Sequence, residues 1–329
     1  MKALQIVENK LAICEIPQPQ PQAGEVLVKL SAVALNHRDQ WIRAGKYPNI
    51  VFNTTLGSDG CGQVTALGKG ASKKWLNKTV VINPNVNWGD DQRIQSSSYQ
   101  VLGMPTAGTL AEYISIPQDR VVEKPKHLTD TEAAALPLAG LTAYRALFHH
   151  GELQKGQKVL ITGIGGGVSQ MAFLWAQAKG AQVSVTSGQP EKLEKMQELG
   201  AFLGFNYKVE WAREAAQQGE SYDLIIDSTG GPQLNSLIKL ARPAGRIVFY
   251  GATTGLPPKI DLYRMFWNQV TLQGSTMGSD KEFVEMIAFT AKHKLVPMID
   301  SVRPFSEALD AFNRMEQSQQ FGKLVLSLT

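Results

Sequence analysis

The sequence predicts a two-domain α/β protein, with a β-rich domain and a second domain built on a parallel sheet covered by helices. Up to about residue 125, short apolar alternations are broken by glycine and proline clusters, a pattern typical of β-rich domains. From about residue 128, helix-like and strand-like segments alternate, and this order gives right-handed crossovers and a parallel sheet. A chain of 329 residues with 43% hydrophobic content is long enough for about two domains.

The parallel-sheet domain is predicted to contain alternating helices and strands. The helices are expected over residues 131–149, 168–179, 190–199 and 233–240. The strands are expected over residues 158–162, 182–186, 222–228 and 245–251. Three of the strands contain the nearly unbroken apolar runs VLI, DLII and RIVFY, which suit a sheet with both faces covered.

The last part of the chain returns to mixed elements. We expect a strand-like segment over 270–278, two helices over 283–293 and 306–315, and a closing strand over 323–328. A tail of roughly 55 residues is short for an independent domain, so we expect it to complete the N-terminal domain. The predicted domains are therefore residues 1–127 with 271–329, and residues 128–270.

Composition excludes several classes of protein. The net charge of +4 is spread over 33 basic and 29 acidic residues without a long run of either sign, so no basic stripe suggests nucleic-acid binding. Only Cys14 and Cys61 are present, which excludes a disulfide scaffold and a four-thiolate zinc site. We find neither the apolar core of a signal peptide nor a membrane-spanning run of about 18 residues. We therefore expect a cytoplasmic protein that does not bind membranes.

A glycine-rich turn, TGIGGGV at 162–168, lies between a predicted buried strand and a predicted helix. Glycine keeps such a turn tight and lets the backbone approach a pyrophosphate, which the helix N-terminus attracts through its free N–H groups and dipole. A glycine-rich run alone is weak evidence, but here the strand, turn and helix occur in the required order. We therefore expect dinucleotide binding.

The end of the second predicted strand indicates which dinucleotide is bound. Enzymes that use NAD usually carry an acidic residue there, which binds the ribose 2′-hydroxyl. Here the segment 186–189 reads TSGQ, and Lys192 and Lys195 follow it. A hydroxyl and an ammonium can bind a 2′-phosphate that no carboxylate repels, so the sequence favours NADP(H). The alternative is that both lysines belong to the solvated face of a helix.

The order and spacing of the motifs resemble the medium-chain dehydrogenase/reductase superfamily along essentially the whole chain. The motifs are NHRDQWIRAGKYP (36–48), LGSDGCGQVTALG (56–68), GTLAEYISIP (108–117), PLAGLTAYRAL (137–147), KVLITGIGGGV (158–168), DSTGG (227–231), GRIVFYG (245–251) and GKLVL (322–326). The resemblance implies a GroES-like β-rich catalytic domain and a Rossmann, doubly wound parallel-sheet cofactor domain. It also implies that residues 270–278 form an edge strand that pairs across a two-fold axis, so we expect a homodimer.

The zinc ligands of this superfamily are missing. Zinc members bind the catalytic metal through a Cys, a His and a second Cys, and the matching positions here are Asn36, Ser58 and Ala139. Alanine cannot bind a metal, and the other two are poor zinc ligands without a thiolate or imidazole nearby. The segment that matches the four-cysteine structural lobe, residues 83–103, contains no cysteine. We therefore expect no metal.

A substitute metal site is the remaining possibility. It would use His37, Asp39 and Asp59, a carboxylate–histidine set that is chemically permitted. The resemblance assigns these residues differently, because family members direct the histidine toward the cofactor pyrophosphate and keep the aspartate away from the metal. We therefore expect His37 to bind the cofactor and Asp39 to orient its neighbours.

Loss of zinc removes the Lewis acid that would polarise a carbonyl or acidify an alcohol. The resemblance then favours the zinc-independent quinone oxidoreductase branch, in which NADPH reduces a quinone or an α,β-unsaturated carbonyl. Such a small-molecule substrate delocalises the incoming charge, so hydrogen-bond donors and positioning can suffice. Two alternatives stay open: an enoyl-thioester reductase, and a non-catalytic homologue that binds nucleotide and serves as a scaffold.

The resemblance also implies site residues. Asn36 is expected to donate to the developing oxyanion, and Tyr47 and Ser58 to line the pocket as proton or hydrogen-bond donors. The expected cofactor-binding residues are His37, Thr142, Gly165, Gly166, Gly167, Val168, Ser187, Lys192, Tyr207, Gly251, Thr253 and Gly274.

Two positions depart from the family pattern. Ser169 replaces the third glycine of the phosphate motif, and we expect it to loosen the helix–strand packing slightly. Arg38 replaces a small hydroxyl residue that serves a proton relay in zinc members, so we expect no such relay.

Overall fold

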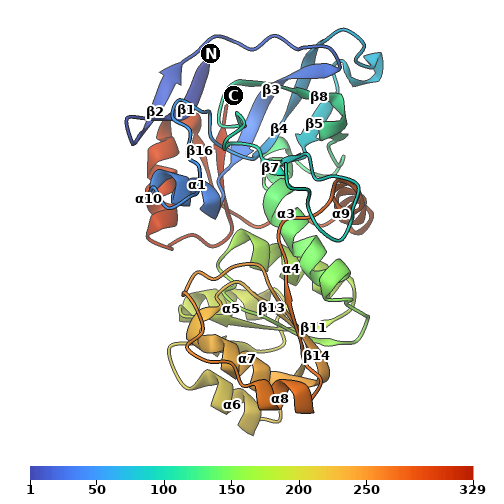
Figure 1. Cartoon of the computed structure of the whole chain (residues 1–329), viewed down its shortest axis with the longest axis vertical. Helices are drawn as coiled ribbons and strands as arrows, with labels where there is room; N and C mark the ends of the chain where they lie inside the picture. The colour runs from blue at the N-terminus through green and yellow to red at the C-terminus, as the bar shows by residue number, and fades with distance from the viewer. Residues whose placement is uncertain (329) are drawn as a thin grey trace. The chain divides into compact units, whose positions relative to one another are not determined.

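The computed structural model describes residues 1–328, which divide into two compact units (Figure 1). The first unit comprises residues 1–139 and the chain from residue 279 onward, and the second comprises residues 140–278. Both boundaries lie later in the chain than the predicted boundaries at 127/128 and 270/271. The first is displaced because helix α2 (Asp130–Ala134) packs on strands β3 (Glu25–Ala34) and β4 (Asp59–Leu67) of the first unit.

The first unit is built around one sheet of seven strands. Its antiparallel part contains β3, β4, β5 (Thr79–Ile82), β8 (Tyr113–Pro117) and β9 (Val121–Glu123). The C-terminal strand β17 (Lys323–Ser327) pairs antiparallel with β3, and β16 (Ile299–Pro304) pairs parallel with β17. Figure 1 shows this red C-terminal segment among the blue N-terminal strands. The end of the chain therefore completes the sheet of the N-terminal segment.

Smaller elements complete this unit. The strand pairs are β1 (Lys2–Val7) with β2 (Lys10–Glu15), and β6 (Asn85–Val86) with β7 (Gln100–Val101). The helices are α1 (His37–Arg43), α2, α9 (Asp280–His293) and α10 (Ala308–Glu316). In α10, Ala308, Ala311, Phe312 and Met315 are buried, at the spacing of one helical face. This face packs into the core cluster that contains Leu30 and Leu326, which fixes the C-terminal segment against the sheet.

The second unit contains a six-stranded parallel sheet in the order β12-β11-β10-β13-β14-β15. Its strands are β10 (Lys158–Ile161), β11 (Gln182–Ser187), β12 (Gly204–Asn206), β13 (Tyr222–Asp227), β14 (Ala241–Phe249) and β15 (Thr271–Gly274). The strand order reverses at β10, which is first in sequence in this unit and lies between β11 and β13. In open parallel sheets, ligands bind outside the carboxyl ends of the strands at such a switch point. This arrangement confirms the predicted α/β fold class.

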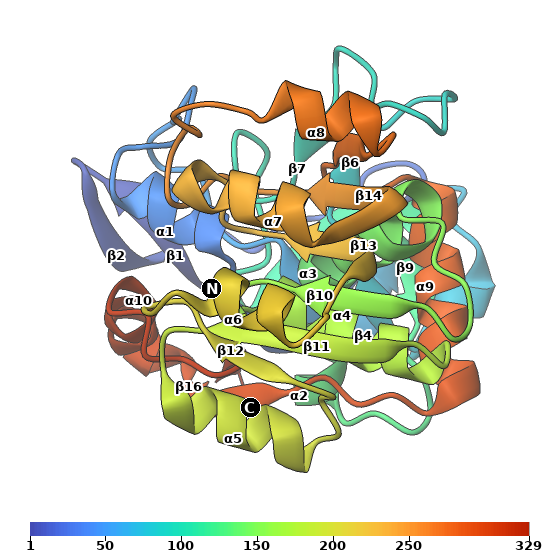
Figure 2. The same ribbon diagram turned by 90° about the horizontal axis from the view of Figure 1, so that it is seen from below.

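Helices flank the second sheet. They are α4 (Gly167–Ala178), α5 (Pro190–Glu198), α6 (Trp211–Gln217), α7 (Leu234–Leu240) and α8 (Leu262–Trp267). Figure 2 shows the strands side by side, with α5 beside β12 and α7 beside β14. Strand β12 and the short helices α6 and α8 were not predicted, since each spans too few residues for a clear periodicity.

The helix predicted over residues 131–149 is wrong as one element. The structure has α2, then α3 (Pro137–Tyr144), and then a π-helical segment over Arg145–His150. Pro137 explains the interruption, because proline lacks a backbone N–H and disfavours helical backbone in the residue before it. No helix in the described residues 1–328 has the length and apolar character needed to cross a membrane.

Candidate functional site

The predicted site residues fall into two groups, one within each unit. In the first unit they surround the N-terminus of α1, where Asn36 is the residue before the first turn and has an extended backbone. The backbone N–H of Asn36 donates to Asp39 Oδ2 at 2.9 Å. Because an acidic side chain in the first turn satisfies an otherwise unpaired N–H, Asp39 fixes the start of the helix. His37, the first residue of α1, is exposed.

The side chain of Asn36 is bonded to two charged residues. Lys323 Nζ donates to Asn36 Oδ1 at 2.7 Å, and Asn36 Nδ2 donates to Asp59 Oδ2 at 2.9 Å. Lys323 and Asp59 are themselves paired at 2.8 Å, and both side chains are buried. The other oxygen of Asp59 accepts from the backbone N–H of Leu138 at 2.8 Å. Asn36 is therefore part of a buried charged network that links β4, β17 and the start of α3.

Arg38 connects the other two predicted catalytic residues. One guanidinium nitrogen donates to Ser58 Oγ at 2.8 Å and to the Leu102 carbonyl oxygen at 2.6 Å. The other donates to Tyr47 Oη at 3.3 Å and to the Met104 carbonyl oxygen at 3.2 Å. Ser58 Oγ in turn donates to the Leu102 carbonyl oxygen at 2.7 Å. Because a hydroxyl has one proton, Ser58 has none left for a substrate, which argues against its predicted role as a donor.

Four buried charges lie close together in this part of the unit, namely Arg38, Lys323, Asp39 and Asp59. Their formal charges cancel. Burial raises the pKa of Asp39 to about 6, and the charge of Arg38 and the N–H of Asn36 only partly oppose this effect. Asp39 therefore carries an electrostatic cost at neutral pH.

The positions that match the zinc ligands do not fit a zinc ion. Ala139 has no ligand atom, Asn36 Oδ1 faces the ammonium of Lys323, and Ser58 Oγ faces the guanidinium of Arg38. Two cations thus contact the oxygen atoms that would have to bind the metal, and like charges at this range repel strongly in a buried site.

The alternative metal set of His37, Asp39 and Asp59 is also not assembled. Asp39 binds the N-terminus of α1 and Asp59 binds Lys323. Among residues 1–328, no group of three or more His, Cys, Asp or Glu side chains is arranged to hold a metal ion.

In the second unit, the glycine-rich turn connects β10 to α4. Gly166 precedes the helix with extended backbone, and Gly163 has a φ of +64°. This positive φ favours glycine over residues with a side chain. The first N–H groups of α4 have no partner within the helix and can bind an anion. The predicted residues 165–168 form this turn and the start of α4.

Ser169 binds the glycine-rich turn through its side chain. Its hydroxyl lies 2.7 Å from the Gly163 carbonyl oxygen and 2.9 Å from that of Gly166. The side chain is buried, so a hydrogen bond from it is shielded from water. The glycine rule, which considers only the space that a side chain occupies, does not include these hydrogen bonds, and the effect of Ser169 on the helix–strand packing stays a prediction.

The predicted 2′-phosphate residues come from adjacent elements. Ser187 ends β11, Lys192 lies in the first turn of α5, and Tyr207 follows β12. The backbone N–H of Tyr207 donates to the Ser187 carbonyl oxygen at 3.1 Å. A Cβ on Gly188 would lie 2.7 to 2.9 Å from the Tyr207 ring. Glycine at 188 therefore allows the phenol to lie against the turn that follows β11.

The remaining predicted cofactor residues also lie in the second unit. Thr142 is buried on α3, and Gly274 ends β15. After β14, a Cβ on Gly251 would lie 2.8 Å from the Ser228 carbonyl oxygen, and Thr253 Oγ1 donates to the same oxygen at 3.3 Å. The loops after β13 and β14 are therefore packed against each other.

Sequence reasoning missed one anchor of this region. The buried carboxylate of Asp227, at the end of β13, accepts from Thr162 Oγ1 at 2.6 Å, from Thr229 Oγ1 at 2.7 Å and from the N–H of Gly230 at 2.8 Å. It thereby connects the end of β10 to the loop after β13. The motif DSTGG could have revealed Asp227 as an anchor, since a buried acidic residue at the end of a strand needs several hydrogen-bond donors.

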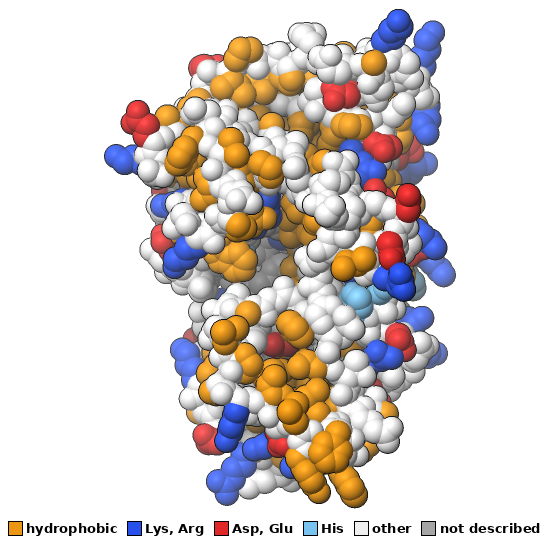
Figure 3. Space-filling model, in the orientation of Figure 1, with side chains coloured by type: hydrophobic (Ala, Val, Ile, Leu, Met, Phe, Trp, Pro, Cys, Tyr) orange, Lys and Arg blue, Asp and Glu red, His pale blue; other side chains and the backbone are white. Residues whose placement is uncertain are grey.

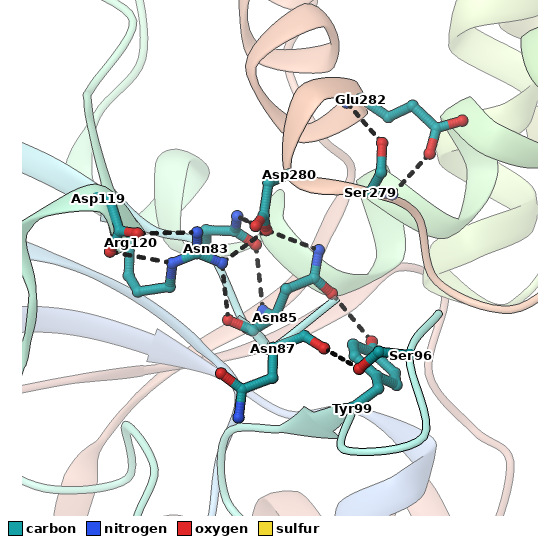
Figure 4. A network of polar contacts seen from close by, with 10 residues as sticks. All are labelled: Asn83, Asn85, Asn87, Ser96, Tyr99, Asp119, Arg120, Ser279, Asp280 and Glu282. Carbon is teal, nitrogen blue, oxygen red and sulfur yellow. Dashed lines mark hydrogen bonds and ion pairs between the residues drawn. The ribbon is translucent and has the colours of Figure 1, made fainter. Parts of the chain in front are cut away.

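A second network holds the segment that matches the structural-zinc lobe (Figure 4). Arg120 donates to Asp280 Oδ1 at 2.6 Å, and Asn83 and Asn85 donate to the same oxygen at 2.8 and 3.3 Å. The Tyr99 hydroxyl donates to Asn85 at 2.9 Å. Polar side chains therefore anchor residues 83–103 to the start of α9, where no cysteine is present.

A cavity of about 670 Å³ adjoins this network within the first unit. Its walls include Trp88, Tyr113 and Arg120, and none of the predicted site residues lines it. We therefore place no catalytic role there.

Comparison with known proteins identifies the family. Residues 22–126 match the model described as the alcohol dehydrogenase GroES-like domain, and residues 167–292 match that described as zinc-binding dehydrogenase. The chain is 36% identical over 335 residues to the zinc-type alcohol dehydrogenase-like protein YogA of Leptosphaeria maculans, with 95% of this chain and 93% of that protein covered. It is 26% identical to a crotonyl-CoA carboxylase/reductase of Cereibacter sphaeroides, over 95% of this chain and 82% of that protein.

Among solved structures, the chain is similar to a crystal structure named as an NAD-dependent alcohol dehydrogenase. The TM-score is 0.94 and the sequence identity 34%, with both chains fully covered. The resemblance and the fold class predicted from the sequence are thereby confirmed. This chain belongs to the medium-chain dehydrogenase/reductase superfamily, as an oxidoreductase of that superfamily with a pyridine-nucleotide cofactor.

Proposed function

We propose that this protein is a zinc-independent reductase that uses NADPH to reduce a quinone or an α,β-unsaturated carbonyl. The observation that carries the proposal is the contact of Lys323 and Arg38 with the two side-chain oxygens at zinc-ligand positions. Without a Lewis acid, a substrate that spreads the incoming negative charge is the easiest to reduce. Quinones and enones have this property.

Bound NADPH would supply the hydride. The residues that would hold it are the turn over 165–168 for the pyrophosphate, and Ser187, Lys192 and Tyr207 for the 2′-phosphate. The turn after β11 reads TSGQ and contains no carboxylate that would repel this phosphate. The related crystal structure is named NAD-dependent, so the choice of dinucleotide needs a direct test.

The residues of the first unit would stabilise the charge on the substrate oxygen. Asn36 Nδ2 uses one hydrogen for Asp59 and has a second one to donate. The Tyr47 oxygen accepts from Arg38, and within residues 1–328 we find no hydrogen bond in which the phenol is the donor. Both groups can therefore donate to an oxyanion. Ser58 would position Arg38 rather than donate to substrate.

Binding and turnover measurements test this proposal. We expect tighter binding of NADPH than of NADH, together with turnover of naphthoquinone-like acceptors or simple enones. Equal or tighter binding of NADH would refute the 2′-phosphate assignment. Stoichiometric zinc in a metal analysis of the purified protein would refute the zinc-independent chemistry.

An enoyl-thioester reductase is the second candidate. The relative named crotonyl-CoA carboxylase/reductase supports it, because reduction of an enoyl thioester is also hydride addition to an activated double bond. Turnover of enoyl thioesters without turnover of quinones or simple enones would favour this candidate.

We further propose a homodimer. Within residues 1–328, strand β15 is an edge of the six-stranded sheet and pairs with β14 alone. An open edge strand invites pairing with another chain. Close to it in sequence, Tyr263 and Trp267 on α8 are 67% and 69% exposed. Figure 3 shows hydrophobic side chains gathered on the surface where Figure 1 places α8. A monomer in analytical ultracentrifugation at micromolar concentration would contradict this proposal.

A further inference from the structure

The amide orientation of Asn36 is fixed by two charged neighbours. Its Oδ1 accepts from Lys323 at 2.7 Å, and its Nδ2 donates to Asp59 Oδ2 at 2.9 Å. An ammonium only donates hydrogen bonds, and an ionised carboxylate only accepts them. If the amide turned over, its NH₂ would face the ammonium and its oxygen would face the carboxylate. Both contacts would then be lost, so one orientation is strongly preferred.

Lys323 itself has no hydrogen left for a ligand. Its Nζ donates to the Leu35 carbonyl oxygen at 2.8 Å, to Asn36 Oδ1 at 2.7 Å and to Asp59 Oδ2 at 2.8 Å. An ammonium has three hydrogens, and these three acceptors account for all of them. The side chain is 4% exposed. Lys323 can therefore influence a substrate only through the groups that it orients.

We infer that Lys323, paired with Asp59, is a positioning residue that presents the Asn36 amide to substrate as a hydrogen-bond donor. The amide oxygen faces the ammonium, and the free donor is the second hydrogen on Nδ2. This inference rests on the proposed reductase function and specifies which substrate group the site recognises.

The recognised group is an oxygen that accepts a hydrogen bond. An N–H donor stabilises the negative charge that develops on a carbonyl or quinone oxygen during reduction. An alcohol would instead need a base that takes its proton, and the amide oxygen beside Lys323 cannot serve as one. The arrangement therefore fits a carbonyl or quinone oxygen as the substrate group that the Asn36 amide binds.

Kinetics of Lys323→Met and Lys323→Arg test the inference. We expect Lys323→Met to lower kcat for quinone or enone reduction about 100-fold, the typical effect of losing one oxyanion donor, with an unchanged Kd for NADPH. Lys323→Arg keeps the charge and the donors, so it should recover most of this loss. An equal loss in NADPH affinity and in kcat would indicate general structural damage and overturn the inference.

A double-mutant cycle asks whether Lys323 acts through Asn36. In an Asn36→Ala background, Lys323→Met should change kcat less than about 2-fold, because coupled residues are non-additive. A full additional 100-fold loss in that background would overturn the inference. Lys323→Met leaves the buried Asp59 carboxylate unpaired, which destabilises the protein by itself. The cycle is therefore repeated with Lys323→Met/Asp59→Asn. This double variant removes both charges and still allows the Asn36 amide to turn over.

An NMR experiment tests this inference independently of the proposed function. In ¹⁵N-asparagine-labelled protein, the Asn36 NH₂ signal is assigned by its absence in Asn36→Ala. We expect one of its two protons to be shifted downfield and protected by the Asp59 carboxylate, and to lose both properties in Lys323→Met/Asp59→Asn. Identical Asn36 signals in the two proteins would overturn the inference. Absence of turnover with every acceptor would refute only the proposed function.

Discussion

The guanidinium carbon of Arg38 lies 5.0 Å from the centre of the Tyr47 ring, and the guanidinium also donates to the phenolic oxygen at 3.3 Å. Both contacts place positive charge beside the phenol. The hydrogen bond occupies a lone pair of the phenolic oxygen and leaves the phenolic hydrogen free. The phenol can therefore still donate a hydrogen bond, and we propose Tyr47 and Asn36 as the two donors to substrate.

Replacing Tyr47 by Phe removes this donor and keeps the ring over Arg38. We expect kcat for quinone or enone reduction to fall about 10- to 100-fold, within the range of a lost proton or oxyanion donor. The Kd for NADPH should not change. Steady-state kinetics and a fluorescence titration check both values. An unchanged kcat with a raised KM would mean that Tyr47 only binds substrate.

Replacing Ser187 by Asp tests the dinucleotide preference. A carboxylate at the end of β11 repels a 2′-phosphate and can bind a ribose 2′-hydroxyl. We expect the Kd for NADPH to rise at least about 10-fold, since one repulsive charge contact costs over 1 kcal/mol, and the Kd for NADH to stay equal or fall. Ser236→Ala on α7 of the same unit is the control. A parallel weakening of both dinucleotides would contradict the assignment.

The raised pKa of Asp39 predicts a pH-dependent stability. Its folded-state pKa of about 6 exceeds the ordinary value of 3.8, so the folded state binds the proton more tightly than the unfolded state. Asp39 therefore costs little stability below about pH 4, and its cost grows as the pH rises toward 6 and then levels off. At neutral pH the cost is on the order of 2–3 kcal/mol.

Asp39→Asn should remove this cost and keep an acceptor for the N–H of Asn36. We expect the variant to gain stability over the wild type as the pH rises from 4 to 7, by on the order of 2 kcal/mol. Urea unfolding at several pH values measures the difference between the two proteins. A difference that does not vary with pH would show that Asp39 has an ordinary pKa.

The network around Arg120 predicts that its ion pair with Asp280 anchors residues 83–103. Asp280→Ala removes the acceptor shared by Arg120, Asn83 and Asn85, and we expect a loss of about 1–2 kcal/mol, since the pair is only partly buried. Asp119→Ala is the matched control. Asp119 is 69% exposed, so its removal should cost less than about 0.5 kcal/mol.

Thermal unfolding and hydrogen exchange over residues 85–101 measure these effects. Exchange should accelerate in that segment in Asp280→Ala and remain unchanged in Asp119→Ala. Equal effects of the two variants would show that the Asp280 contacts do not anchor the segment.

Local patterns were enough to predict the glycine turn and the elements that flank it. The turn over 162–168 lies between apolar runs, and such runs are visible without knowing the fold. The role of Ser169 could not be predicted in this way, because its acceptors are backbone oxygens whose directions depend on the turn geometry. The split of the helix predicted over 131–149 was foreseeable from Pro137, whose effect on the preceding turn is local.

Periodicity and composition by themselves determined the α/β class and the position of the glycine-rich turn. The order of the motifs determined the resemblance, which assigns Asn36, Ser58 and Ala139 to the zinc-ligand positions. The tertiary structure alone decided what surrounds Asn36. Lys323 lies 287 positions away in the sequence and reaches the amide only because β17 pairs with β3. Strand pairing is driven by burial and backbone hydrogen bonds that act between distant segments, so no local pattern could reveal that contact.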